Sequence, residues 1–168
     1  MSLPRESLLV VGAVRPLGEE TVFPKEVQLP PHVTLLPWFE ILETQIHRFS
    51  LTLTRLAERH HSLRLEAGEE DLFGVKKDIP VQRIIACEAI RQIHIDLVRV
   101  ASTFGAQIDQ RWSGDNYRPH ITHTDEDKLQ EGEVVVVPAL QVFSRSPNGD
   151  KILRSEHEFG MSDEQTAA

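Results

Sequence analysis

The chain has 168 residues, of which 40% are hydrophobic and 26% are charged, and this composition is typical of one folded domain of ordinary size. The formal net charge of −8 excludes proteins that wrap long duplex nucleic acid, because these need an excess of Lys and Arg to neutralise phosphates. It leaves open a small nucleotide or an RNA terminus held in a locally basic cleft.

The first half of the chain predicts strands around one long helix. Residues 7–14 form a short, apolar, β-branched run that is typical of a buried strand, and a Pro-containing connection follows at 15–31. The strand predicted at 32–36 should end at Pro37, because proline cannot donate a hydrogen bond to a central sheet. The remaining predicted elements of this half are a helix at 43–60, a strand at 63–67 and a partner strand at 72–75.

The second half repeats this plan. Residues 81–86 are compatible with a strand or with the first turn of a helix. Apolar residues on one stripe predict a helix at 88–104, and Gly105 follows where a helix-ending glycine is expected. The remaining predicted elements are strands at 117–124, 133–137 and 140–143, and a hairpin that turns at 146–150 and returns through 151–159. This order predicts an α+β protein in which helices cover largely antiparallel sheets.

One tetrapeptide pattern occurs once in each half, as Pro31-His32-Val33-Thr34 and as Pro119-His120-Ile121-Thr122. Side chains alternate between the two faces of a strand. Each motif therefore presents an imidazole and a hydroxyl on one face and an aliphatic side chain on the other. Two such tetrapeptides arise by chance on the order of once in a thousand sequences of this composition. The pair indicates a functional site in preference to two ordinary buried histidines.

These residue types suit acid–base chemistry at a phosphate group. Two histidines with an ordinary pKa of ~6.5 could act as base and acid on opposite sides of a phosphorus atom, and His32 and His120 are the candidates. The hydroxyls of Thr34 and Thr122 could donate hydrogen bonds to the non-bridging oxygens, where charge develops in the transition state. This chemistry needs neither a metal nor an organic cofactor, so neither is expected.

Metal-binding alternatives are less favoured by the spacing. His120 and His123 are three residues apart on a predicted strand, so they point to opposite faces and cannot chelate one ion together. His60 and His61 at a helix end are more typical of a solvated pair. Cys87 is the single cysteine, which permits no internal disulfide and no cysteine-based metal cluster, and we expect an inert core residue.

On the two motifs, the chain resembles the 2H phosphoesterases, which include bacterial 2′-5′ RNA ligases and cyclic nucleotide phosphodiesterases. Their hallmark is a pair of His-x-Thr/Ser motifs about eighty to ninety residues apart. The segments 29–35 and 142–159 are similar to the 2′-5′ RNA ligase-like subgroup, and the resemblance covers residues 8–159. It implies two pseudo-symmetric lobes around a central cleft, each with an antiparallel sheet, a helix and one motif.

The resemblance implies an enzyme that acts on a 2′,3′-cyclic phosphate or a 2′-5′ phosphodiester of RNA or a small nucleotide. His32 and His120 would be the catalytic residues, in roles that the sequence does not assign, and Thr34 and Thr122 would hold the phosphate. Many members continue the second motif with Leu-Ala-Arg, whereas this chain has the segment 123–125, His-Thr-Asp. A non-catalytic module that binds a nucleotide or RNA end in the same cleft is therefore the alternative, and an ordinary interaction domain is a further one.

Other residues near the motifs are candidates for substrate binding. Arg118 lies two residues before the second catalytic histidine, on the same predicted face, and could supply the missing positive charge. Three aromatic residues, Tyr117, Trp38 and Phe39, flank the motifs and could stack on a base, although aromatic residues next to a strand more often belong to the core. Arg145 near the C-terminal hairpin could also reach the cleft.

The sequence also predicts where the protein is found. No segment approaches the ~18 apolar residues that a membrane span requires. The apolar stretch at 8–14 is about the minimum length of a signal-peptide core, but it follows the acidic Glu6 and contains Gly12, which favours a strand. We expect a cytoplasmic monomer made of a single two-lobed domain over 1–168, with a frayed polar tail after Met161.

Overall fold

The computed structural model describes residues 2–85, 87–124 and 126–160, so the expected tail after Met161 lies outside the described residues. The strands are β1 (Arg5–Ala13), β2 (Val22–Phe23), β3 (His32–Leu42), β4 (Leu63–Phe73), β5 (Ile79–Ile84), β6 (His120–Thr122), β7 (Val134–Val137), β8 (Ala139–Arg145) and β9 (Lys151–Glu158). The helices are α1 (Ile46–Glu58) and α2 (Glu88–Thr103), with short 3₁₀ turns η1 (Glu43–Gln45) and η2 (Gly114–Asn116). The predicted α+β class is confirmed.

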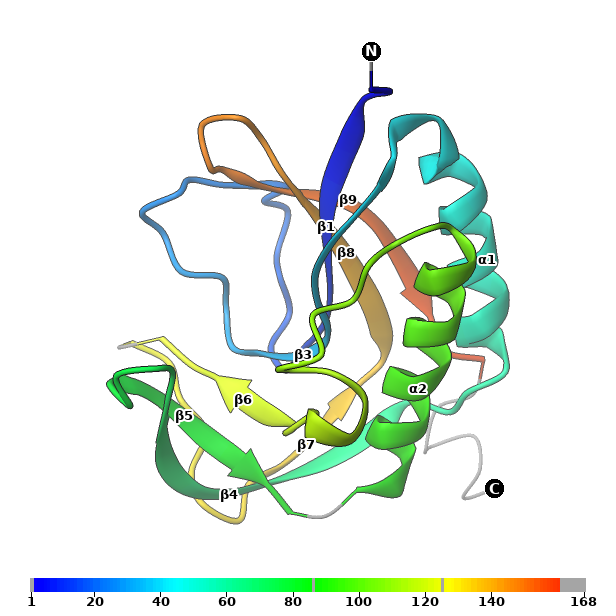
Figure 1. Ribbon diagram of the computed structural model, residues 1–168. Coiled ribbons are helices and arrows are strands. Elements are labelled where there is room, and N and C mark those ends of the chain that lie inside the picture. Colours follow the sequence, from blue (N-terminus) through cyan, green and yellow to red (C-terminus); the bar gives the residue numbers. More distant parts are fainter. Residues whose placement is uncertain (1, 86, 125, 161–168) are drawn as a thin grey trace.

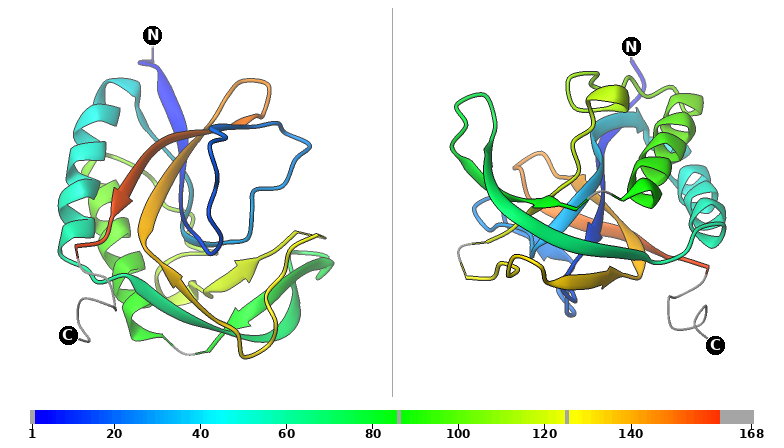
Figure 2. Two further views of the ribbon diagram at one scale, coloured as in Figure 1. Left: turned by 180° about the vertical axis from the view of Figure 1, so that it is seen from behind. Right: turned by 90° about the horizontal axis from the view of Figure 1, so that it is seen from below.

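The strands form one antiparallel sheet in the order β2-β9-β8-β1-β3-β6-β5-β4-β7. Only Pro138 separates β7 from β8, yet β7 pairs with β4 at one end of the sheet and β8 pairs with β1 near the other. The sheet must curl for this to be possible, as Figures 1 and 2 show. Gly12 on β1 lies where the curl is tight, because an added Cβ would meet Val137 Cγ1 at 2.6 Å.

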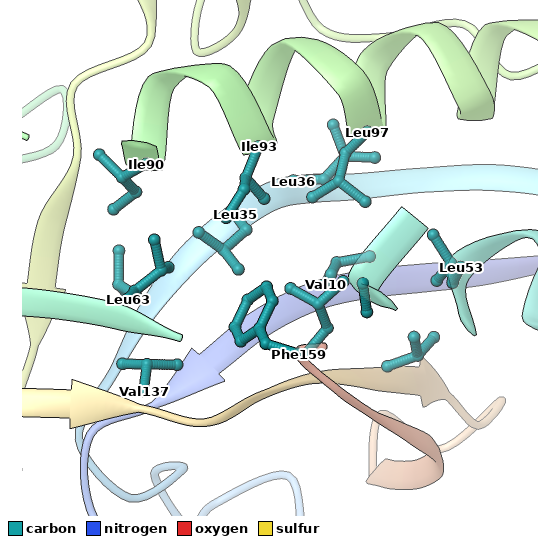
Figure 3. Packing of buried hydrophobic residues seen from close by; sticks show 14 of the residues in the cluster. Val10, Leu35, Leu36, Leu53, Leu63, Ile90, Ile93, Leu97, Val137 and Phe159 are labelled. Atoms are coloured by element: carbon teal, nitrogen blue, oxygen red, sulfur yellow. The ribbon is translucent and has the colours of Figure 1, made fainter. Parts of the chain in front are cut away.

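Both helices lie on one side of the curled sheet (Figure 1), where α1 packs against β9 and α2 against β3. Their inward stripes are buried, and in Figure 3 Ile93 and Leu97 of α2 lie close to Leu35 and Leu36 of β3. Each fully buried Leu or Ile side chain contributes roughly 1.5–3 kcal/mol relative to exposure. Helix α2 ends before Gly105, whose φ of 84° agrees with the predicted helix-ending glycine. Among the described residues, no helix is long and apolar enough to span a membrane.

A second, smaller core covers the opposite side of β1. Leu9 and Val11 alternate with the residues that face the helices, and they pack with Phe23, Leu29 and Phe143. The connection at 15–31 supplies two of these side chains, and it lies on the side away from the helices in Figure 1. It also contains β2, which pairs with β9 and which the sequence did not predict.

The strand expected to end at Pro37 continues to Leu42, so this prediction is wrong. Leu8 pairs with Phe39 and Val11 pairs with Thr34, so an advance of three residues along β1 corresponds to five residues along β3. Two register shifts each add one residue to β3, as in a β-bulge, and the shift opposite Leu8 to Val10 includes Pro37. A bulge accommodates proline because its residues need not donate to the ladder.

Two other strand predictions need correction. Residues 72–73 belong to the same strand as 63–67, the eleven-residue β4, and do not form a partner strand. The partner is β5, which occupies most of the weakly predicted segment 81–86. The strand predicted at 117–124 is reduced to β6, three residues long. Its three residues pair with β5, and two of them, Ile121 and Thr122, also pair with β3.

Candidate active site

Strands β3 and β6 are neighbours in the middle of the sheet, and their pairing brings the two motifs together. His32 pairs directly with Thr122. The observed register runs to the pair Val33 and Ile121, and its continuation by one residue sets Thr34 opposite His120. Directly paired residues have side chains on the same face, with Cβ atoms roughly 4.5–5.5 Å apart. The two imidazoles and two hydroxyls therefore form one four-cornered patch, with the histidines at opposite corners.

The middle residue of each motif anchors this patch from behind. Val33 pairs with Ile121, and both side chains are 0% exposed in the core on the helix side of the sheet. They point away from the histidines and threonines because side chains alternate along a strand. One face of each motif thus holds the fold together and the other is left for chemistry.

Both histidines make the same local hydrogen bond. Nδ1 of His32 lies 2.9 Å from the carbonyl oxygen of Pro30, and Nδ1 of His120 lies 2.8 Å from that of Arg118. A carbonyl oxygen only accepts, so Nδ1 donates the hydrogen in each ring. Nε2 has no hydrogen-bond partner among the residues that the structure describes. It accepts a proton when the ring is neutral and donates one when the ring is charged.

Burial lowers the pKa of both histidines. For His32, burial has the largest effect and the positive charges of His120 and Lys151 add to it, against the opposing hydrogen bond to Pro30, so that the pKa falls to about 4. Burial also lowers the pKa of His120, against the hydrogen bond to Arg118. Both rings are therefore neutral at pH 7 in the free protein. A phosphate anion bound beside them would raise both pKa values, because it stabilises the protonated rings.

Three of the four motif side chains, Thr34, His120 and Thr122, line a cleft of about 740 Å³. Small-molecule sites typically have volumes of roughly 300–1,000 Å³. The walls come from the hairpin that joins β4 to β5 and from the loop before β6, and they include Leu72, Phe73, Lys77, Ile79, Trp112 and Arg118. His32 is 8% exposed, so only a small part of its ring is open to solvent.

The model of the 2′-5′ RNA ligase superfamily matches residues 5–135, a span that includes both motifs. The chain belongs to this superfamily. The predicted resemblance to 2H phosphoesterases is thereby confirmed at the level of the family. No curated protein matches the chain by sequence.

Solved structures share the superfamily fold at low sequence identity. A crystal structure described as a phosphoesterase matches with a TM-score of 0.65 at 13% identity, over 93% of this chain and 99% of that chain. E. coli LigT in complex with 3′-AMP matches with a TM-score of 0.63 at 14% identity, over 93% of this chain and 99% of LigT. LigT in complex with NADP+ gives 0.61 at 13% identity, over 94% and 99%. The 2H phosphoesterase-like fold expected from the motifs is the fold of these proteins, and here it consists of one curled antiparallel sheet with two helices.

In this member of the 2′-5′ RNA ligase superfamily, a buried ring pair links the two motifs. His94 of α2 donates from Nδ1 to the carbonyl oxygen of Leu35 at 2.7 Å and accepts the Gly114 N–H at Nε2 at 3.0 Å. Its ring stacks on Tyr117, with centroids 3.8 Å apart and planes 8° from parallel. The Tyr117 hydroxyl donates to the carbonyl oxygen of Thr34 at 2.7 Å. The segment before the second motif is thus attached to β3 of the first.

The structure changes the roles expected for the flanking aromatic residues. Tyr117 is 4% exposed and one face of its ring is covered, which favours a structural role over stacking on a base. Phe39 is buried in the main core, as aromatic residues beside a strand more often are, so it does not stack on a base. Trp38 packs on the smaller core, and Arg145 lies 4.0 Å over its ring, so these two residues contact each other. Arg118 is exposed and lines the cleft, where it was expected.

Sequence reasoning missed two aromatic residues of the cleft. The ring centroids of Phe73 and His120 are 4.5 Å apart, so Phe73 restricts the orientation of the His120 ring. Trp112 is 45% exposed and also lines the cleft. The sequence could have indicated Trp112 as a ligand-binding residue, because it lies in a polar loop shortly before the second motif. A large aromatic side chain in such a loop is not expected to pack in the core.

The metal-binding alternatives, which the spacing disfavoured, gain no support from the arrangement. Nε2 of His60 lies 2.9 Å from a carboxylate oxygen of Asp96, which links the segment after α1 to α2. No group of three or more His, Cys, Asp and Glu residues is placed to hold a metal ion within 2–85, 87–124 and 126–160. Asp125, the last residue of the segment that replaces the Leu-Ala-Arg of many members, lies outside the described residues. Metal independence stays a prediction that needs an activity measurement.

Proposed function

We propose that the protein is a metal-independent phosphoesterase that acts on a 2′,3′-cyclic phosphate or a 2′-5′ phosphodiester of RNA or a small nucleotide. The observation that carries this proposal is the β3–β6 register, which sets each histidine opposite the threonine of the other motif on one face of the sheet. Superfamily membership supports a phosphoesterase-type reaction. The LigT structures with 3′-AMP and NADP+ support a nucleotide ligand.

The reaction proposed for this patch is an in-line displacement at phosphorus. One histidine takes a proton from water through Nε2 as the water oxygen forms its bond to phosphorus. The other histidine gives its Nε2 proton to the ribose oxygen as the bond from that oxygen to phosphorus breaks. Each turnover consumes one water molecule, and the proton taken by the base replaces the proton given by the acid. In the reverse direction, which re-forms the bond between the ribose oxygen and phosphorus and releases water, the two roles exchange.

The threonines bind the phosphate in this mechanism. The hydroxyls of Thr34 and Thr122 donate hydrogen bonds to the non-bridging oxygens, which gain negative charge in the transition state. Both threonines belong to strands, and the buried side chains of Val33 and Ile121 anchor those strands in the core. The donors are therefore already oriented before the substrate binds.

Arg118 provides positive charge at the same cleft in this proposal. Its own carbonyl oxygen accepts the hydrogen bond from His120 Nδ1, and its side chain lines the cleft. Arg118 forms no ion pair with any residue that the structure describes, so its guanidinium is available to a phosphate. It would replace the arginine that many members carry after the second motif.

Turnover of defined substrates tests the proposal. Purified protein in EDTA is given 2′,3′-cyclic mononucleotides, 2′-5′-linked dinucleotides and ADP-ribose cyclic phosphate. We expect hydrolysis of at least one class without added metal. Binding of the same compounds with no turnover would favour the non-catalytic alternative, and activity that is lost in EDTA and restored by one divalent ion would contradict the metal-independent mechanism. A cytoplasmic monomer with a role in RNA processing is part of the same proposal.

A further inference from the structure

A second cavity lies beside the catalytic cleft. Its volume is about 350 Å³, and Asp71, Phe73, Arg83 and Arg118 line both spaces. Because the same four side chains border both, the two spaces are direct neighbours. The far wall of the second cavity is formed by the start of α2, including Cys87, Glu88 and Arg91.

Arginines dominate this second cavity, although the whole chain carries a formal net charge of −8. Three of them, Arg83, Arg91 and Arg118, line it together with the carboxylates of Asp71 and Glu88. Arg83 forms an ion pair with Asp71, in which Nη2 of the arginine lies 2.7 Å from Oδ2 of the aspartate. Arg91 and Arg118 form no ion pair with the residues that the structure describes. Two guanidinium groups outside any ion pair thus share one cavity with the Glu88 carboxylate. The hydrogen bond from Arg83 lowers the pKa of Asp71, and the charge of Arg118 also helps to lower it.

Arg91 is held in place at the cavity. Its Nη1 donates to the carbonyl oxygen of Tyr117 at 3.3 Å. A guanidinium has five N–H donors, so this bond leaves most of them free. Tyr117 directly precedes Arg118, which brings the Arg91 side chain close to the second unpaired arginine. Guanidinium groups bind phosphate oxygens through charge-assisted, often bidentate hydrogen bonds.

We propose that the second cavity binds a further phosphate group of the substrate, attached to the 5′ oxygen of the ribose whose 2′ oxygen reacts. The inference rests on the proposed function, in which the scissile phosphate lies at the two histidines. Arg118 then lies between the two phosphate positions because it lines both spaces. The preferred substrates are therefore RNA ends or dinucleotides, which carry this phosphate, and not 5′-unphosphorylated mononucleotides.

Binding of two compounds that differ by one phosphate tests this inference. Adenosine 2′-monophosphate and adenosine 2′,5′-bisphosphate are titrated into the protein by calorimetry. We expect the bisphosphate to bind at least ~10-fold more tightly, since a hydrogen bond to a charged group contributes roughly 1.5–3 kcal/mol. Arg91→Gln should reduce this preference to within about twofold. The matched control is Arg99→Gln, which changes an exposed arginine of α2 outside the cavity and should keep the preference.

Two results would overturn the inference. The first is equal affinity of the unmodified protein for both compounds. The second is equal weakening of both compounds by Arg91→Gln, which would show that Arg91 acts only by holding Tyr117. Neither measurement needs catalysis, so a bisphosphate preference without turnover of any cyclic phosphate would reject the proposed function and keep the second phosphate site.

Two longer ligands identify the source of the second phosphate. One is a 3′-5′ diribonucleotide ending in a 2′-phosphate, and the other is a pyrophosphate-linked dinucleotide with a ribose 2′-phosphate. Tighter binding of the diribonucleotide points to an RNA end, and tighter binding of the pyrophosphate compound points to a small dinucleotide. Both ligands should lose affinity in Arg91→Gln, and retention of full affinity for both would contradict the inference.

Discussion

The Tyr117 hydroxyl donates a hydrogen bond of 2.7 Å to the carbonyl oxygen of Thr34, and so connects the approach to the second motif with the backbone of the first. Burial raises the pKa of Tyr117, so the hydroxyl remains a donor at neutral pH. Strand β6 has only three residues and offers few hydrogen bonds to β3. The Tyr117 contact therefore adds to the alignment of the two histidines.

Replacement of Tyr117 by Phe keeps the ring that stacks on His94 and removes only the hydroxyl. We expect kcat to fall several-fold with little change in KM, because small displacements of catalytic groups slow the reaction more than they weaken binding. The free energy of unfolding should fall by about 1–3 kcal/mol, since the Thr34 carbonyl loses its partner. Steady-state kinetics and urea denaturation measure the two effects. Unchanged kcat and stability would show that the contact aligns nothing.

The pH dependence of kcat/KM should be bell-shaped with its maximum below pH 6.5. One histidine must be neutral and the other protonated, and burial lowers the pKa of both in the free protein, to about 4 for His32. On the acid side, kcat/KM should fall near pH 4, and on the alkaline side it should fall before or near pH 6.5. The two apparent pKa values of this profile belong to the coupled pair of histidines. The profile of kcat should shift to higher pH, because a bound phosphate raises both pKa values. A kcat/KM that rises between pH 6.5 and 9 would be inconsistent with this account.

Fold stability should also depend on the histidines. Burial is the main cause that lowers the pKa of His32, His94, His120 and His157. The histidines of the unfolded chain therefore bind protons at a higher pH than those of the folded protein. The free energy of unfolding has its full value above about pH 6.5 and decreases as the pH falls toward 4. For His32 alone the loss is on the order of 3 kcal/mol. Urea denaturation between pH 8 and 4 measures it, and stability that is constant down to pH 4 would contradict the burial of these rings.

Trp112 should affect how the nucleoside part of a substrate is bound. Its side chain is 45% exposed at the cleft, and stacking of a base on an aromatic ring contributes roughly 1–3 kcal/mol. Trp112→Ala should raise KM by about 5-fold to 100-fold and change kcat little. The matched control is Trp38→Ala, because Trp38 packs on the smaller core beneath Arg145 and does not line the cleft. Equal KM values for Trp112→Ala and the unmodified protein would exclude a stacking role.

The sequence predicted the parts of the site that depend on strand alternation. His32 and Thr34 share a face because they are two residues apart in β3, and the same holds for His120 and Thr122 in β6. The direct pairing of β3 with β6 was not predicted, because register is a long-range property that neither strand specifies alone. The tautomers of both histidines follow from the carbonyl two residues earlier, and this too required coordinates.

Features that depend on contacts between residues distant in the sequence were harder to anticipate. The role of His94 depends on the loop at η2 packing against α2, and its position among apolar helix residues suggested nothing beyond core packing. Pro37 indicated a strand end, but the bulge between β1 and β3 accommodates it. The segments 63–67 and 72–75 were predicted as separate strands because a polar, glycine-containing stretch lies between them, whereas in the structure one strand, β4, continues through this stretch to Phe73.

The two histidines should carry the reaction as a unit. Replacement of either one by Ala should reduce turnover by at least ~10²-fold, and the double variant should be little worse than the weaker single variant, because groups that act together are not additive. Thr34→Val and Thr122→Val should cost about 10-fold to 10²-fold, as expected for the loss of one transition-state hydrogen bond. A double variant that loses the product of the two single effects would indicate independent roles.

The most direct test of the account is the kcat of His32→Ala and His120→Ala with a 2′,3′-cyclic phosphate substrate in EDTA, beside His47→Ala, which changes an exposed histidine of α1. Circular dichroism confirms that each variant is folded. We predict that both motif variants lose at least ~10²-fold in kcat while His47→Ala keeps the activity of the unmodified protein. Near-normal kcat in a folded His32→Ala or His120→Ala variant would contradict the two-histidine mechanism.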